Sequence, residues 1–176
     1  MLGKLIDALP SRRTCYLLAF AICAGLLLFA VYLEQALKLE PCPLCIIQRV
    51  FVAALGLVFL VAALHNPGRV GAIGYALSAG VLALVGAATA ARHVWIQNLP
   101  PDQLPECGPG LDYMLETLPL SETVKMVLHG SGECAENAWL FLGIGIPGWT
   151  LIFFLALGLL AVLLAWKDLP MSKVKR

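Results

Sequence analysis

The sequence predicts an all-α membrane protein, a four-transmembrane-helix bundle with a long outer loop that carries a short amphipathic helix. The chain has 176 residues, of which 60% are hydrophobic and 13% are charged. Soluble domains average roughly 45–50% apolar and about 25% charged residues. The mean hydropathy is +0.86. Four stretches are long enough to cross a bilayer, because a helix needs about 20 apolar residues to span the hydrocarbon layer.

The predicted spans cover residues 14–33, 44–64, 71–91 and 146–166 of a single domain, residues 1–176. The first span follows Lys4, Arg12 and Arg13, as the apolar part of a signal peptide would. Its apolar run is longer than the roughly 7 to 15 residues of such a segment. We therefore expect it to remain in the protein as a span.

The basic residues predict the orientation, because Lys and Arg in short loops stay on the cytoplasmic side. They gather in residues 1–13, 65–70 and 167–176, which we expect to be cytoplasmic, with both termini on that side. The outer loops are then residues 34–43 and 92–145. These loops hold nine of the eleven acidic residues: Glu34, Glu40, Asp102, Glu106, Asp112, Glu116, Glu122, Glu133 and Glu136. No basic stripe with interleaved aromatic residues appears, so we expect no nucleic-acid partner.

The long outer loop contains one weakly amphipathic stretch, residues 115–128. We expect a short helix there, with Leu118, Val124, Val127 and Leu128 against the membrane surface. Connections of this length without a span of their own are usually functional.

Four of the six cysteines fall on the outer side. Cys42 and Cys45 lie at the mouth of the second span, and Cys107 and Cys134 lie in the long loop. That side permits disulfides. Cys15 and Cys23 lie in the first span, where we expect them to pack as small hydrophobic residues without a functional role.

A Cys-x-x-Cys pair alone is compatible with a redox, zinc or haem site. No histidine follows the pair directly, which argues against covalent haem attachment. The other outer candidates for zinc, Cys107, Cys134, His93 and His129, have spacings unlike a zinc finger or ribbon, so we expect no metal site. Two purely structural disulfides remain an alternative, although so short a Cys-x-x-Cys ring restrains little unfolded-chain entropy.

The residues around Cys45 favour reactivity. Pro43 suits the first position of a helix, which puts Cys45 in the first turn, where the helix dipole stabilises a thiolate. Arg49 lies one turn further on the same face. Its guanidinium either extends to the membrane interface or donates hydrogen bonds to an oxygen of a lipid-soluble acceptor. His93, at the outer end of the third span, is either an interfacial anchor or a residue that orients or protonates a quinone.

The combined pattern resembles the DsbB family of bacterial inner-membrane proteins that generate disulfides. The resemblance extends over residues 12–166. It rests on Pro-Cys-x-x-Cys at residues 41–45 with Arg49, on Cys107, and on Gly-Glu-Cys-Ala-Glu at residues 132–136 leading through Trp139 and residues 141–143 to Pro147.

The resemblance implies an electron relay in the bacterial inner membrane. Cys107 and Cys134 would take electrons from a periplasmic thioredoxin-fold protein similar to DsbA, with Cys107 forming the mixed disulfide. Cys134 would then exchange with Cys42. Cys45 would pass the electrons to a quinone, ubiquinone or menaquinone, near Arg49 and His93. Cys107 and Cys134 would form the mobile, partner-facing pair, and Cys42 and Cys45 the fixed, quinone-facing pair.

Two alternatives belong to other classes. One is a structural or assembly protein whose disulfides stabilise its outer loops. The other is an enzyme of the vitamin K epoxide reductase type, in which we expect the Cys-x-x-Cys late in the chain, not at the start of the second span. One departure from the family pattern is Gln48, where an acidic residue beside Arg49 would be unsurprising.

Overall fold

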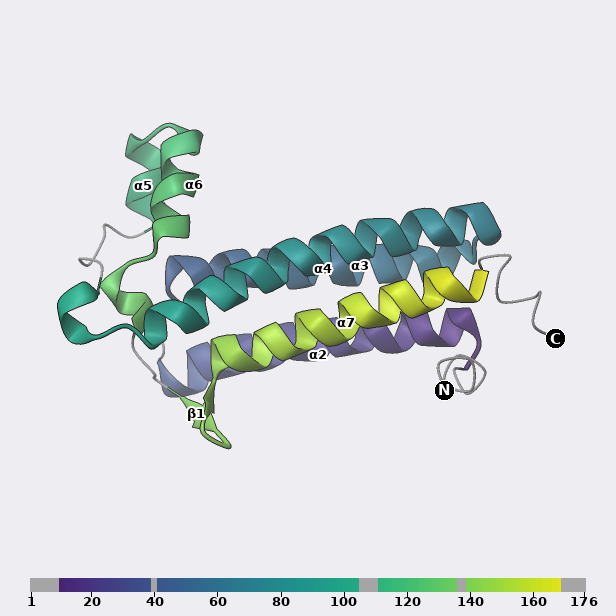
Figure 1. Ribbon diagram of the computed structural model, residues 1–176, viewed down its shortest axis with the longest axis horizontal. Helices are drawn as coiled ribbons and strands as arrows, with labels where there is room; N and C mark the ends of the chain where they lie inside the picture. Colours follow the sequence, from purple (N-terminus) through teal and green to yellow (C-terminus); the bar gives the residue numbers. More distant parts are fainter. Residues whose placement is uncertain (1–9, 39–40, 105–110, 136–138, 169–176) are drawn as a thin grey trace.

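The computed structural model describes residues 10–38, 41–104, 111–135 and 139–168. Four long helices run side by side along its length (Figure 1): α2 (Arg12–Leu37), α3 (Pro43–His65), α4 (Arg69–Gln97) and α7 (Ile146–Asp168). Each is long and apolar enough to cross a membrane. The predicted fold class, a membrane bundle of four helices, is confirmed.

The short elements all lie at one end of this bundle (Figure 1). They are the 3-10 turns η1 (Pro101–Gln103) and η2 (Gly132–Ala135), the helices α5 (Leu111–Thr117) and α6 (Leu120–His129), and the strands β1 (Leu140–Phe141) and β2 (Ile144–Gly145). The start of α2 and the end of α7 lie at the opposite end, as a chain that crosses a membrane four times requires. The described part of the long loop between α4 and α7 therefore lies at one end of the bundle only.

The loop helix differs from the prediction for residues 115–128. The structure has two helices there, α5 and α6, which are separated at Leu118 and Pro119. Proline lacks the backbone N–H and disfavours helical backbone at the residue before it, so one continuous helix is not possible. Val127 is buried and Leu118 packs against the same cluster, whereas Val124 and Leu128 are exposed. Half of the face expected to contact the membrane thus packs onto the protein.

The sequence analysis did not predict the small antiparallel hairpin of β1 and β2, in which Leu140 pairs with Gly145 and Phe141 pairs with Ile144. The connecting residues, Leu142 and Gly143, both have positive φ, 53° and 78°. Two consecutive positive φ values are what a two-residue hairpin of type I′ requires. A leucine in the first of these positions is unusual, and this is why the sequence carries no turn signal there.

The interior of the bundle depends on close helix packing. α4 packs along α7 and α3, and α2 packs along α3. Seven of the ten buried residues of α4 are alanine or glycine, and small residues let membrane helices approach closely. A Cβ atom on Gly86 would overlap the ring of Phe154 from α7. Cys15 and Cys23 are buried in this core, as expected from the sequence.

Candidate functional site

The site begins where α3 begins. Cys42 caps the helix with extended backbone, and Pro43 is the first helical residue, as predicted. The backbone N–H of Ile46 donates to the carbonyl of Cys42 at 3.2 Å, which closes the first turn around Cys45. The positive end of the helix dipole is therefore beside both cysteines, where it favours a negatively charged sulfur.

His93, near the end of α4, lies against both of these thiols. Its Nε2 is 3.8 Å from the Cys42 sulfur, and its Nδ1 is 3.9 Å from the Cys45 sulfur. The side chain is buried, with 2% of its surface exposed. From the sequence, His93 was either a membrane anchor or a quinone contact. In the structure it lies against both sulfurs, and both of its ring nitrogens have hydrogen-bond partners within the protein.

The hydrogen bonds of His93 define which ring nitrogen carries the proton. Nε2 is 3.0 Å from the backbone carbonyl oxygen of Cys134, which can only accept, so Nε2 is the donor. The amide nitrogen of Gln48 is 3.2 Å from Nδ1 and donates to it. Nδ1 is therefore a proton acceptor that faces the Cys45 thiol.

Cys134 lies in the same cluster, on η2. It is buried, with 1% exposed, and it packs with Cys42, Leu44 and Ile96. A hydrogen bond with the Cys42 thiol, together with burial, raises the pKa of Cys134 well above that of an ordinary cysteine. From the sequence, Cys134 was expected to belong to a mobile, partner-facing pair with Cys107 and to exchange with Cys42; in the structure it is adjacent to Cys42. Cys107 lies outside the described residues.

A cavity of about 720 Å³ opens beside the two cysteines of α3. Its walls come from α2, α3, α4, α7 and the hairpin, and they are mostly apolar. Five aromatic side chains line it: Phe29, Trp139, Phe141, Trp149 and Phe153. Trp139 stacks on Phe141 with ring centroids 5.9 Å apart, and the indole of Trp149 donates to the Phe141 carbonyl at 3.2 Å. A volume of this size suits a small organic ligand with an apolar body.

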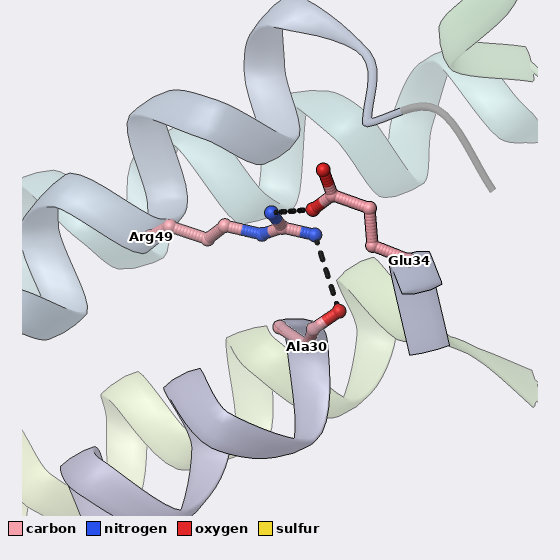
Figure 2. A network of polar contacts seen from close by, with 3 residues as sticks. All are labelled: Ala30, Glu34 and Arg49. Carbon is pink, nitrogen blue, oxygen red and sulfur yellow. Dashed lines mark hydrogen bonds and ion pairs between the residues drawn. The ribbon is translucent and has the colours of Figure 1, made fainter. Parts of the chain in front are cut away.

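Arg49 also lines this cavity, one helical turn from Cys45. Its guanidinium nitrogen Nη1 donates to the Glu34 carboxylate at 2.6 Å, and Nη2 is 3.5 Å from the Ala30 carbonyl oxygen (Figure 2). Both partners belong to α2. The guanidinium is therefore held at the cavity and is not extended toward bulk water.

The structure thus brings five of the six predicted site residues to one place: Cys42, Cys45, Cys134, Arg49 and His93. Sequence reasoning missed Glu34 and the role of Gln48 as the hydrogen-bond donor to His93. The available signal for Glu34 was its place directly after the predicted first span, on the side of the membrane where Arg49 lies near the start of the second span. No local signal pointed to Gln48, because its partner is 45 positions away.

The same side chains offer metal-ligand atoms. The sulfurs of Cys42 and Cys45 and a ring nitrogen of His93 all lie within 4.8 Å of one another. A soft cation such as Zn²⁺ accepts this donor set. The fold brings a distant histidine to the cysteines, a proximity that the spacing of these residues in the sequence does not reveal. The closeness of the sulfurs equally suits thiol–disulfide exchange.

Comparisons with known proteins give one consistent result. The family model described as "Disulfide bond formation protein DsbB" matches residues 12–164. A relative from Methylococcus capsulatus, named "Disulfide bond formation protein B", is 52% identical over 158 residues, which are 90% of this chain and 96% of that protein. A protein of the same name from Nitrosococcus oceani is 54% identical over 152 residues, 86% of this chain and 90% of that one. "Disulfide bond formation protein B 1" from Pseudomonas aeruginosa is 46% identical over 148 residues, 84% and 91% of the two chains.

The match covers all four long helices and both outer cysteine pairs, at a level of identity far above what a shared fold alone would leave. It also agrees with a multi-pass membrane protein in which Cys42, Cys45 and Cys134 lie together in one cluster. The chain therefore belongs to the DsbB family of membrane proteins for disulfide bond formation.

Proposed function

We propose that this chain is a protein-disulfide:quinone oxidoreductase that reoxidises a DsbA-like dithiol protein on the periplasmic side of the bacterial inner membrane. The observation that carries the proposal is that Cys134, Cys42 and Cys45 lie together in one cluster, and that Cys42 and Cys45 line an apolar cavity of about 720 Å³. Three thiols in sequence beside a ligand-sized cavity suit electron transfer from a protein to a small acceptor.

The relay follows from thiol–disulfide exchange, in which a thiolate attacks a disulfide sulfur and releases another thiolate. A thiolate of the reduced partner attacks Cys107 in a disulfide of Cys107 with Cys134, which releases Cys134. Cys134 then attacks Cys42 in a disulfide of Cys42 with Cys45, and Cys45 is released as a thiolate. The hydrogen bond between Cys134 and Cys42 supports this second step. The second thiolate of the partner attacks the partner's own sulfur in the mixed disulfide, which releases the oxidised partner and the Cys107 thiolate. Cys107 then attacks Cys134 and releases Cys42, so that Cys42 and Cys45 are left as the two thiols that a quinone would reoxidise.

The cavity fits a quinone by size, apolar walls and polar groups. Its aromatic side chains match a flat ring with an apolar tail, and Arg49 supplies N–H donors for a ring oxygen. When bound, a quinone supplies the oxidising power, because it takes up two electrons and two protons and becomes a quinol. Arg49 and His93 are the residues that would hold it, beside Cys45.

His93 has a separate task in this scheme, to hold protons for the thiols. Nδ1 lies 3.9 Å from the Cys45 sulfur and is a proton acceptor in the tautomer that the Cys134 carbonyl selects. It can take the Cys45 proton when the Gln48 amide releases its hydrogen bond to Nδ1, while Nε2–H stays on the carbonyl oxygen of Cys134. A histidine with these contacts helps to keep Cys45 as a thiolate next to the cavity.

The orientation belongs to the same proposal. The basic residues near the ends of the spans predict cytoplasmic termini, which puts the thiols on the periplasmic side. A disulfide-generating site needs that compartment, because cytoplasmic reductants keep thiols reduced.

The proposal is tested by interrupting the relay at its last thiol. With purified protein, a reduced DsbA-like partner and a soluble quinone, wild type should consume quinone and oxidise the partner. Cys45→Ser should abolish quinone reduction and still form a mixed disulfide with the partner at Cys107, detectable on a non-reducing gel.

Cys23→Ser is the matched control, since Cys23 is buried in the membrane core and should retain full turnover. Full turnover in Cys45→Ser would refute the assigned role of Cys45. If serine substitutions of the outer cysteines lowered only the thermal stability, a protein with purely structural disulfides would be indicated.

A further inference from the structure

The ion pair between Glu34 and Arg49 joins two helices at the mouth of the cavity. Glu34 lies on α2 and Arg49 on α3, and both line the cavity. Figure 2 shows the Glu34 carboxylate and the Ala30 carbonyl, one turn apart on α2, facing the same guanidinium. The Arg49 side chain is 29% exposed and the Glu34 side chain is 40% exposed, so the pair lines the cavity without being enclosed by it.

An arginine without such a partner would have a different preferred position. A long basic side chain near a helix end extends its charge toward the aqueous interface. Arginine also has many rotamers, and a planar guanidinium binds an oxygen well only when its orientation is fixed. The contacts from α2 fix the Arg49 guanidinium at the cavity.

The hydrogen bonds leave part of the guanidinium for a ligand. Arginine carries five N–H donors. Within the part of the chain that the structure describes, Nη1 donates one hydrogen bond to Glu34 and Nη2 donates one to the Ala30 carbonyl. The remaining donors are available to an oxygen of a molecule in the cavity.

We propose that Glu34 is a positioning residue for quinone binding. Its carboxylate orients Arg49 across the cavity mouth, so that the free donors of the guanidinium face the quinone oxygen. This inference rests on the proposed quinone-reducing function. It extends that function to an acidic residue of α2 that binds no electron carrier itself and acts through Arg49.

Equilibrium binding of a soluble quinone tests the proposal without requiring turnover. Trp139 and Trp149 line the cavity, so a bound quinone should quench tryptophan fluorescence and report a Kd. Glu34→Ala should raise this Kd by about two- to fivefold, the range that a partly exposed ion pair supports. Glu34→Gln, which keeps an acceptor oxygen but not the charge, should fall between Glu34→Ala and wild type.

Steady-state kinetics should show that Glu34 affects the binding of quinone and not the binding of the dithiol partner. In Glu34→Ala the KM for quinone should rise by a similar factor, while the KM for the dithiol partner and kcat at saturating quinone stay at wild-type values. Gln35→Ala changes the adjacent exposed residue of α2 and should leave both KM values unchanged.

A double-substitution cycle decides whether Glu34 acts through Arg49. In an Arg49→Ala background, Glu34→Ala should cause no further change in the quinone Kd. An equal loss in both backgrounds, or a Kd in Glu34→Ala that is unchanged or lower than wild type, would overturn the proposal. Failure of wild type to bind any quinone would instead overturn the proposed function.

Discussion

Individual residues of the site differ in how far local sequence determines their environment. The position of Cys45 in a first helical turn follows from Pro43 two residues earlier, so it was predictable. The environment of Cys134 was not, because its neighbours Cys42 and Ile96 come from α3 and α4. The sequence placed Cys134 in an outer loop, but only the folded chain shows that it is buried beside Cys42.

The raised pKa of Cys134 leads to a pH-dependent prediction. A free cysteine ionises near pH 8.5, roughly, and only the thiolate is alkylated efficiently. Because the hydrogen bond with Cys42 and burial favour the protonated form, alkylation of Cys134 in the reduced protein should begin to rise only at higher pH. Peptide mass spectrometry of the modified protein across a pH series measures this profile.

Cys42→Ala provides the comparison for Cys134. It removes the hydrogen bond that contributes most to the raised pKa, so the profile should move to lower pH. Because Cys134 remains buried, its alkylation in this variant should still begin at a higher pH than that of a free cysteine. A wild-type profile like that of free cysteine, or no movement in Cys42→Ala, would contradict the contact between the two thiols.

Gln48 allows a stability prediction at the same scale. It is buried and donates to His93 Nδ1. Gln48→Leu leaves that nitrogen without its donor, at a cost of about 1–3 kcal/mol. Thermal unfolding in detergent should show a lower Tm, whereas Gln35→Leu, at an exposed position of α2, should not. Equal Tm values for the two variants would argue against the hydrogen bond.

At the scale of elements, the long helices were predictable and the short ones were only partly so. Hydropathy determines a membrane span over about 20 residues, so single positions matter little. The region of α5 and α6 is governed instead by one proline, Pro119, and by the packing of Val127 on Leu44 and Cys42. The hairpin depends on a leucine with positive φ, Leu142, which no sequence pattern indicates.

Because α4 packs closely against α7, alanine should destabilise the protein at one glycine of α4 and not at another. Gly86→Ala places a Cβ atom against the Phe154 ring, so the helices must separate, at a cost of about 1–3 kcal/mol. Gly74→Ala on the same helix meets no atom within 4 Å, and alanine favours a helix over glycine. Urea or thermal unfolding should therefore separate the two variants. A stabilising effect of Gly86→Ala would show that the two helices are less closely packed.

At the scale of the whole molecule, the two ends of the bundle have different tasks. One end holds Cys42, Cys45, Cys134 and the short elements, and the other holds the α3–α4 turn, the start of α2 and the end of α7. The distribution of basic residues predicted this polarity from the sequence. The cavity itself was not predictable, since four helices and the hairpin contribute its walls.

The orientation of the protein in the membrane can be tested directly with reporter fusions, one at the C-terminus and one within the outer loop. Alkaline phosphatase needs the oxidising periplasm for activity, because its disulfides do not form in the cytoplasm. Fused after Arg176, it should be inactive, and fused within the outer loop after Gln103 it should be active. The reverse pattern would put the thiols on the cytoplasmic side and contradict the proposed role in disulfide formation.

The central claim is that Cys42 and Cys45 pass electrons to a quinone, and a single-turnover experiment tests it most directly. The fully reduced protein is mixed anaerobically with one equivalent of quinone, and the quinone absorbance and the remaining thiols are followed together. We predict that two thiols disappear for each quinone reduced, with a new disulfide between Cys42 and Cys45 found in the digested product. Unchanged quinone absorbance, or thiols at Cys42 and Cys45 that stay reduced while quinone is consumed, would contradict the account.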